Sequence, residues 1–107
     1  MSKTRIVNVN SDEWASAVLV DRNAVYIGRA NGRRGFAKSF WSNPFHLGYD
    51  GTRVEVIEKY RAYLMDQPNL LARLPELRGK VLGCFCAPLA CHGDCLVELV
   101  EALEVSE

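Results

Sequence analysis

The residues best suited to chemistry in this sequence lie in one stretch near its C-terminus, 84–95. This stretch holds all four cysteines of the chain and one of its two histidines, His92. An apolar run, 81–83, precedes it, and a segment with apolar residues at helical spacing, 96–103, follows it. This order predicts a buried strand, a tight loop and the start of a helix. In open α/β sheets ligands bind at such a junction, so the stretch is a candidate site.

The thiols and the imidazole of this stretch can be interpreted as a zinc site. Cys84 and Cys86 share one face of the expected strand because side chains alternate along a strand. If the chain then turns back, Cys91 and His92 approach them, and three sulfurs and one nitrogen suit tetrahedral zinc. However, the C-x-C spacing departs from the usual C-x(2–4)-C pattern, and adjacent Cys91 and His92 fit poorly on one ion. The spacing therefore favours the alternative, in which Cys84 and Cys86 are small buried core residues.

A third interpretation makes the stretch catalytic, with Cys91, His92 and Asp94 as the candidate catalytic residues. Cys91 would precede a helix N-terminus, which lowers the pKa of a thiol, and His92 could act as base if its ring turns inward. Asp94 could accept a ligand hydroxyl, as acids do in dinucleotide folds, although capping the helix is its simpler role. Gly93 would let a ligand approach the backbone closely, which makes it a candidate ligand-binding residue.

A second group of candidate residues lies in the irregular segment 30–51, which is long for a loop in a compact domain. Basic and aromatic residues alternate in and around it, which suits contacts to a phosphate and stacking on a base. Pro44 holds Asn43 in an extended conformation that presents its amide. We therefore take Arg29, Trp41 and Asn43 as candidate ligand-binding residues. The alternative is a solvated basic loop held by a few buried aromatic side chains.

The elements that must position these residues follow from the apolar pattern. The apolar character of 80–86 predicts a central strand that is buried on both faces. Thr52 and Glu55 form the capping box of a helix that ends near Asp66, because Pro68 follows. Further strands are expected at 5–10 and 24–27, and further helices at 12–18, 70–77 and 93–103. This order predicts one small α/β domain over 1–107, Rossmann-like with two or three layers, with a central strand at 80–86 and a C-terminal helix.

The composition narrows the class of function. The net charge of +0 at pH 7 argues against a protein that coats nucleic acid. No apolar run approaches the ~20 residues of a membrane span, and the N-terminus does not resemble a signal peptide. A cytoplasmic location is therefore expected, where clustered cysteines indicate a metal or reactive thiols before they indicate disulfides.

Two segments also carry a family resemblance. The W-x-N-P-F segment at 41–45 and the C-x-C-x-P-x-x-C-H-G-D segment at 84–94 resemble a family of uncharacterised phage and bacterial proteins, a domain of unknown function. The resemblance covers most of the chain from Arg5 onward. The loop between Arg29 and Trp41 looks longer than is usual, and Cys95 replaces a more typical aliphatic residue. The resemblance implies a site at Arg29, Asn43, Pro44, Cys84, Cys86, Cys91, His92 and Asp94.

These observations lead to one expected function and two alternatives. We expect a small protein that binds a nucleotide-like or phosphorylated small molecule between the loop around Arg29 and Asn43 and the turn 91–94, with a possible enzymatic action on it. One alternative is a phage-encoded interaction protein that binds a host protein through its aromatic loop. The other is a binding module stabilised by zinc.

Overall fold

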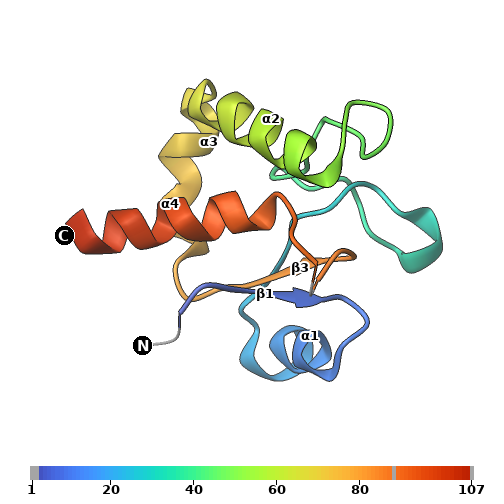
Figure 1. Ribbon diagram of the computed structural model, residues 1–107. Coiled ribbons are helices and arrows are strands. Elements are labelled where there is room, and N and C mark those ends of the chain that lie inside the picture. The colour runs from blue at the N-terminus through green and yellow to red at the C-terminus, as the bar shows by residue number, and fades with distance from the viewer. Residues whose placement is uncertain (1–2, 88, 107) are drawn as a thin grey trace.

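The computed structural model describes residues 3–87 and 89–106, and within them the chain is a mixed α/β structure (Figure 1). Its strands are β1 (Arg5–Asn8), β2 (Ala24–Tyr26) and β3 (Val81–Cys84). Its α-helices are α1 (Asp12–Ser16), α2 (Arg53–Met65), α3 (Pro68–Arg73) and α4 (Gly93–Ser106). Shorter helical turns are the π-helix η1 (Ala17–Asp21) and the 3-10 helices η2 (Gly32–Arg34) and η3 (Leu74–Leu77). The expected α/β class is therefore confirmed, whereas a Rossmann-like arrangement is not.

The three strands form one parallel sheet in the order β1-β3-β2. Arg5 of β1 and Ala24 of β2 both lie opposite Val81 of β3, so the strands begin and end at common edges of the sheet. β3 is the middle strand and each of its residues is buried, as its apolar sequence predicts. It is shorter than the expected 80–86, because the ladder ends at Cys84 and the chain turns away after it.

Side chains of β3 alternate between two separate hydrophobic clusters, one on each face of the sheet. Leu82 and Cys84 belong to the larger cluster, which includes buried residues of α2 and α4. Val81 belongs to the smaller cluster, which holds Trp14 of α1. Figure 1 shows α4 over one face of the sheet, α1 against the other, and α2 on the far side of α4. Strand alternation thus assigns each residue of β3 to one layer of helices.

The ends of α2 follow from local sequence signals. The Thr52 hydroxyl accepts a hydrogen bond from the Glu55 N–H at 3.3 Å, and the Glu55 carboxylate accepts one from the Thr52 N–H at 2.9 Å. This is the expected capping box, which satisfies two free amides at the helix start. The helix ends at Met65 with Asp66 as its C-cap, as expected from Pro68. The expected helix 70–77 is instead two pieces, α3 and η3.

The buried face of α4 differs from the expected one. The sequence predicts a stripe that includes Leu96, Leu99 and Val100. Leu96 and Val100 are fully buried, but so is Cys95, whereas Leu99 is only partly buried. The face that meets the core is therefore rotated toward Cys95, because α4 must cover the sheet and contact α2 at once. Among the helices that the structure describes, none is long and apolar enough to cross a membrane.

Candidate functional site

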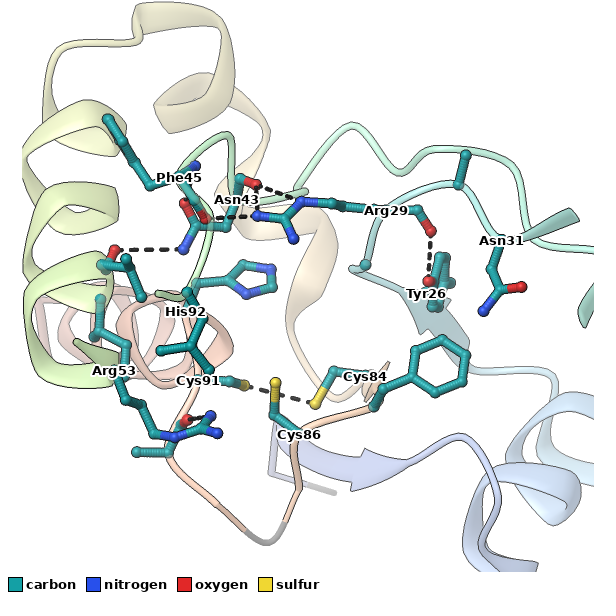
Figure 2. Close-up of a pocket in the computed structure, with 17 residues that line it drawn as sticks. Tyr26, Arg29, Asn31, Asn43, Phe45, Arg53, Cys84, Cys86, Cys91 and His92 are labelled. Atoms are coloured by element: carbon teal, nitrogen blue, oxygen red, sulfur yellow. Dashed lines mark hydrogen bonds between the residues drawn. The ribbon is translucent and has the colours of Figure 1, made fainter. Parts of the chain in front are cut away.

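A pocket of about 220 Å³, which we call the strand-end pocket, lies where β2 and β3 end (Figure 2). Residues that follow β2, including Arg29, form one side of it. The end of β3, from Cys84 to Cys86, lines it from the sheet. The first turns of α2, the loop segment 43–47 and the turn before α4 complete the lining. The pocket thus occupies the carboxyl edge of a parallel sheet, the edge at which ligands bind in open α/β folds.

Three cysteines line this pocket, and two of them are in direct contact. The Sγ atoms of Cys84 and Cys91 lie 3.6 Å apart, and both side chains are buried. In Figure 2 the sulfurs of Cys84, Cys86 and Cys91 are directed toward the same part of the pocket. Cys86 is only half-buried, so the expectation that it is buried like Cys84 holds in part. The fourth cysteine, Cys95, is buried outside the lining, and its thiol donates to the Ile57 carbonyl at 3.7 Å.

The contact between Cys84 and Cys91 polarises the pair. A hydrogen bond from the Cys91 thiol lowers the pKa of Cys84 to about 6, and backbone N–H groups of Ala87 and Cys86 act in the same direction. The pKa of Cys91 is raised because its thiol serves as the donor and because it is buried. These opposite directions favour Cys84 as the more acidic thiol of the pair, although the sequence pointed to Cys91 as the nucleophile.

His92 is held away from these thiols. Its Nε2–H donates to the Ile27 carbonyl at 2.8 Å, and its ring meets the Tyr60 ring edge to face at 4.8 Å. Burial lowers the pKa of His92, and the Arg29 guanidinium lowers it further, against the opposing backbone carbonyls of Ile27 and Trp41. The imidazole is therefore neutral at pH 7 and fixed in one tautomer. This arrangement does not supply a base to Cys91.

The same geometry bears on the zinc hypothesis for Cys84, Cys86, Cys91 and His92. The described part of the chain contains no group of three or more histidine, cysteine or acidic side chains that could hold a metal ion. The reason at this site is visible in Figure 2, where the His92 ring points toward the loop around Asn43 rather than toward the sulfurs. These residues, as arranged, do not fit a tetrahedral zinc site.

Arg29 and Asn43 lie in contact, but their polar groups bond to the protein backbone. Nε and Nη2 of Arg29 donate to the Asn43 carbonyl at 3.2 and 3.0 Å, and Nη2 also donates to the Phe45 carbonyl at 2.5 Å. The Asn43 amide donates to the Val56 carbonyl at 3.3 Å and accepts from the Phe45 N–H at 2.9 Å. Both side chains therefore stabilise the loop that forms one wall of the strand-end pocket.

Arg53 supplies a second guanidinium to the lining, although it was not among the site residues predicted from the sequence. It is the first residue of α2, and its Nη1 donates to the Ala90 carbonyl at 3.0 Å, 37 residues away in the chain. The capping box places Arg53 at the start of a helix, and this position could have marked it as a candidate anion-binding residue because the first turn of a helix attracts anions. The lining also includes Tyr26 and Phe85, and among the residues that the structure describes it includes no carboxylate.

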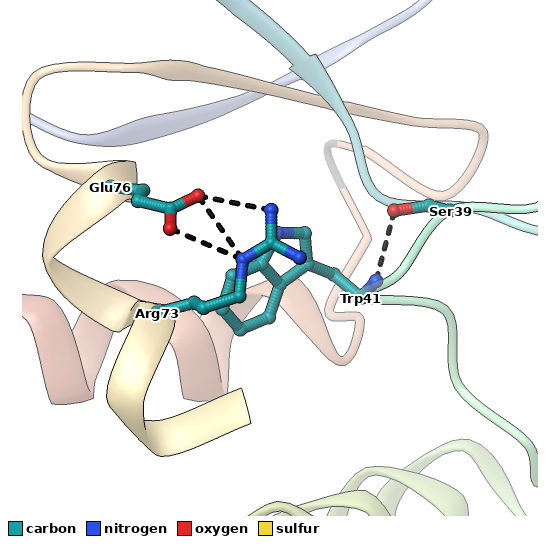
Figure 3. Close-up of polar contacts among 4 residues, drawn as sticks. All are labelled: Ser39, Trp41, Arg73 and Glu76. Atoms are coloured by element: carbon teal, nitrogen blue, oxygen red, sulfur yellow. Dashed lines mark hydrogen bonds and ion pairs between the residues drawn. The ribbon is translucent and has the colours of Figure 1, made fainter. Parts of the chain in front are cut away.

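Three other candidate residues lie outside this lining. Trp41 is 4% exposed within the core, its carbonyl accepts the Tyr60 hydroxyl at 2.9 Å, and its N–H donates to the Ser39 hydroxyl at 3.0 Å (Figure 3). Asp94 is exposed, and its carboxylate accepts the Cys91 N–H at 3.1 Å, which is the simpler capping role. Gly93 is buried, and a Cβ there would lie 2.7 Å from the side chain of Ile27. Pro88 of the second motif lies outside the described residues.

Comparison with known proteins places this chain in a family. A family model described as "Domain of unknown function (DUF4326)" matches residues 9–102. An uncharacterized protein of Acanthamoeba polyphaga mimivirus is 33% identical over 96 residues, which cover 80% of this chain and 73% of that protein. An uncharacterized protein of Enterobacteria phage T4, from the nrdA-td intergenic region, is 36% identical over 70 residues. That match covers 61% of this chain and 63% of the phage protein, less than two thirds of its length. No solved structure matches the chain.

Proposed function

Since the chain belongs to the family described as Domain of unknown function (DUF4326), we propose that its function is to bind a phosphorylated, nucleotide-like small molecule in the strand-end pocket. The observation that carries the proposal is the set of groups around this one pocket. Arg29 and Arg53 bring two guanidinium groups to a lining whose described residues include no carboxylate, beside the rings of Tyr26 and Phe85. Guanidinium groups suit phosphate oxygens, and aromatic faces suit a base.

The position of the pocket supports the same function. Nucleotide ligands of open α/β sheets bind outside the carboxyl ends of the strands, and in a Rossmann-like fold the phosphates meet a helix N-terminus there. In this chain the 13-residue α2 begins at Arg53, so this guanidinium is carried by the first turn of a helix. A phosphate near Arg53 would therefore meet a cationic side chain and a helix start together. The position of the pocket supports this function by analogy with other α/β folds.

Of the two guanidinium groups, that of Arg53 makes fewer hydrogen bonds within the protein and so has more N–H donors for a ligand. Arg29 directs three hydrogen bonds at the carbonyls of Asn43 and Phe45, so its removal would also loosen the loop. Arg53 is half-buried and makes one such bond, to Ala90. We therefore assign the phosphate contact to Arg53 and the shaping of the pocket wall to Arg29.

The test is a thermal-shift and calorimetric screen of nucleoside mono-, di- and triphosphates, ribose 5-phosphate and inorganic phosphate. We expect at least one nucleotide to bind more tightly than inorganic phosphate, and Arg53→Ala to weaken it by at least tenfold, since a charge-assisted hydrogen bond contributes ~1.5–3 kcal/mol. Arg33→Ala removes an equal charge from an exposed position outside the lining and should leave affinity unchanged. Absence of binding across the panel, or equal affinity in both variants, would contradict the proposal.

A further inference from the structure

We propose that Cys84 and Cys91 form a dithiol centre that reacts with a small-molecule disulfide entering the strand-end pocket and closes to a Cys84–Cys91 disulfide. The centre is a second activity of this pocket and does not depend on the phosphorylated ligand. Its basis is the sulfur–sulfur contact of 3.6 Å between two cysteines that both line the same cavity.

The placement of the two residues allows the bond to form. The sulfurs must come closer by ~1.5 Å to reach disulfide length. Cys84 is held in the ladder at the end of β3, while Cys91 lies in the irregular turn before α4. The described residues between them, 85–87 and 89–90, lie outside regular helix or strand, so this connection can absorb the small displacement. Closure requires no change in the sheet.

The surroundings of Cys84 favour its thiolate. The contact with the Cys91 thiol lowers the pKa of Cys84, as do the backbone N–H groups of Ala87 and Cys86, while burial and the charge of Asp94 oppose this shift. The Asn8 amide stabilises this loop by donating to the carbonyls of Phe85 and Ala87 at 3.3 and 2.9 Å. Because the thiolate is the nucleophile in thiol–disulfide exchange, a thiol whose pKa is lowered on balance, and which contacts a second thiol, is suited to attack.

The reaction balances as two successive exchanges. The Cys84 thiolate attacks one sulfur of the incoming disulfide, and the first leaving thiolate takes the proton of the Cys91 thiol. The resulting Cys91 thiolate attacks the Cys84 sulfur of the mixed disulfide and expels the second thiolate. The protein dithiol is oxidised by two electrons and the small disulfide is reduced by two. A thiol reductant such as reduced glutathione restores the starting state by the reverse sequence.

Two other cysteines provide internal comparisons. Cys86 lines the pocket and is half-buried, so it is the competing partner for either thiol. Cys95 is fully buried outside the lining and bonds to the Ile57 carbonyl, so it should take no part. Each position can be converted to serine with little change in volume.

The experiment treats the folded, reduced wild-type protein with bis(2-hydroxyethyl) disulfide, followed by acid quenching, alkylation and non-reducing peptide mapping. We expect the loss of two hydrogens per chain and a single cross-link between Cys84 and Cys91. Cys91→Ser should stop at a mixed disulfide carrying one hydroxyethylthio group on Cys84, while Cys95→Ser should behave as the wild type. Wild-type protein that forms no internal disulfide, or that links Cys86 instead, would overturn the proposal. The wild-type mapping decides this even if a variant fails to fold.

Discussion

The close packing of Trp14 on Gly83 allows one substitution to be treated quantitatively. Gly83 lies in the middle strand, on the face that α1 covers. A Cβ built there would lie 2.4 Å from Cζ3 and 2.7 Å from Cε3 of Trp14. Carbon atoms pack at ~3.5–4.0 Å, so Gly83→Ala forces the indole to move by about 1 Å or more. Trp14 belongs to a buried cluster, which leaves it little free space for that movement.

The expected cost follows from two opposing effects. Overpacking a core by one methyl group costs ~1–3 kcal/mol. Replacing glycine within a strand returns ~0.5–1 kcal/mol, because alanine loses less conformational freedom on folding. The net destabilisation is therefore about 1–2 kcal/mol. With an unfolding entropy of ~2.1 cal/mol/K per residue, a chain of 107 residues should melt ~4–9 °C lower.

The assay is urea unfolding followed by circular dichroism, supported by thermal melting. Gly32→Ala is the matched control, because a Cβ at that position meets no atom within 4 Å. Trp14→Leu should make room for the new methyl group, so the double variant should be less destabilised than the two single changes predict, by about 1 kcal/mol. A Gly83→Ala protein as stable as the wild type, or additive behaviour in the double variant, would refute the packing argument.

Two further expectations concern α2 and His92. Thr52→Ala should lower the free energy of unfolding by about 1 kcal/mol, measured by urea titration, because it removes the side-chain acceptor of the capping box. An unchanged midpoint would show that Glu55 alone suffices. Burial lowers the pKa of His92 below 6.5 in the folded state, so the unfolded chain binds the proton more readily. The stabilisation is thus complete above about pH 6.5 and decreases as the pH falls below it. His92→Gln should flatten this part of the stability profile, and a profile of unchanged slope would contradict it.

Local features of this chain could be predicted from the sequence because they depend on residues close together. The capping box joins Thr52 and Glu55, which are three positions apart. The start of α1 depends on Ser11, whose hydroxyl accepts the Trp14 N–H at 3.2 Å. The central position of β3 follows from apolar residues on both faces, since a strand with no polar face must be covered twice. The parallel sheet edge then locates a pocket near Arg29 and Cys84.

The sequence alone could not determine where side chains point or which residues far apart in the chain come into contact. Arg53 reaches the pocket because α2 packs near the turn before α4, a contact over 37 residues. His92 turns from its neighbour Cys91 toward Ile27, 65 residues away, because the buried ring meets a backbone carbonyl there that accepts its N–H.

The contact between Cys84 and Cys91 likewise depends on how α4 docks on the sheet, which also selects Cys95 for the buried face of the helix. Spacing alone places these thiols in one loop, and only close packing decides which sulfurs meet.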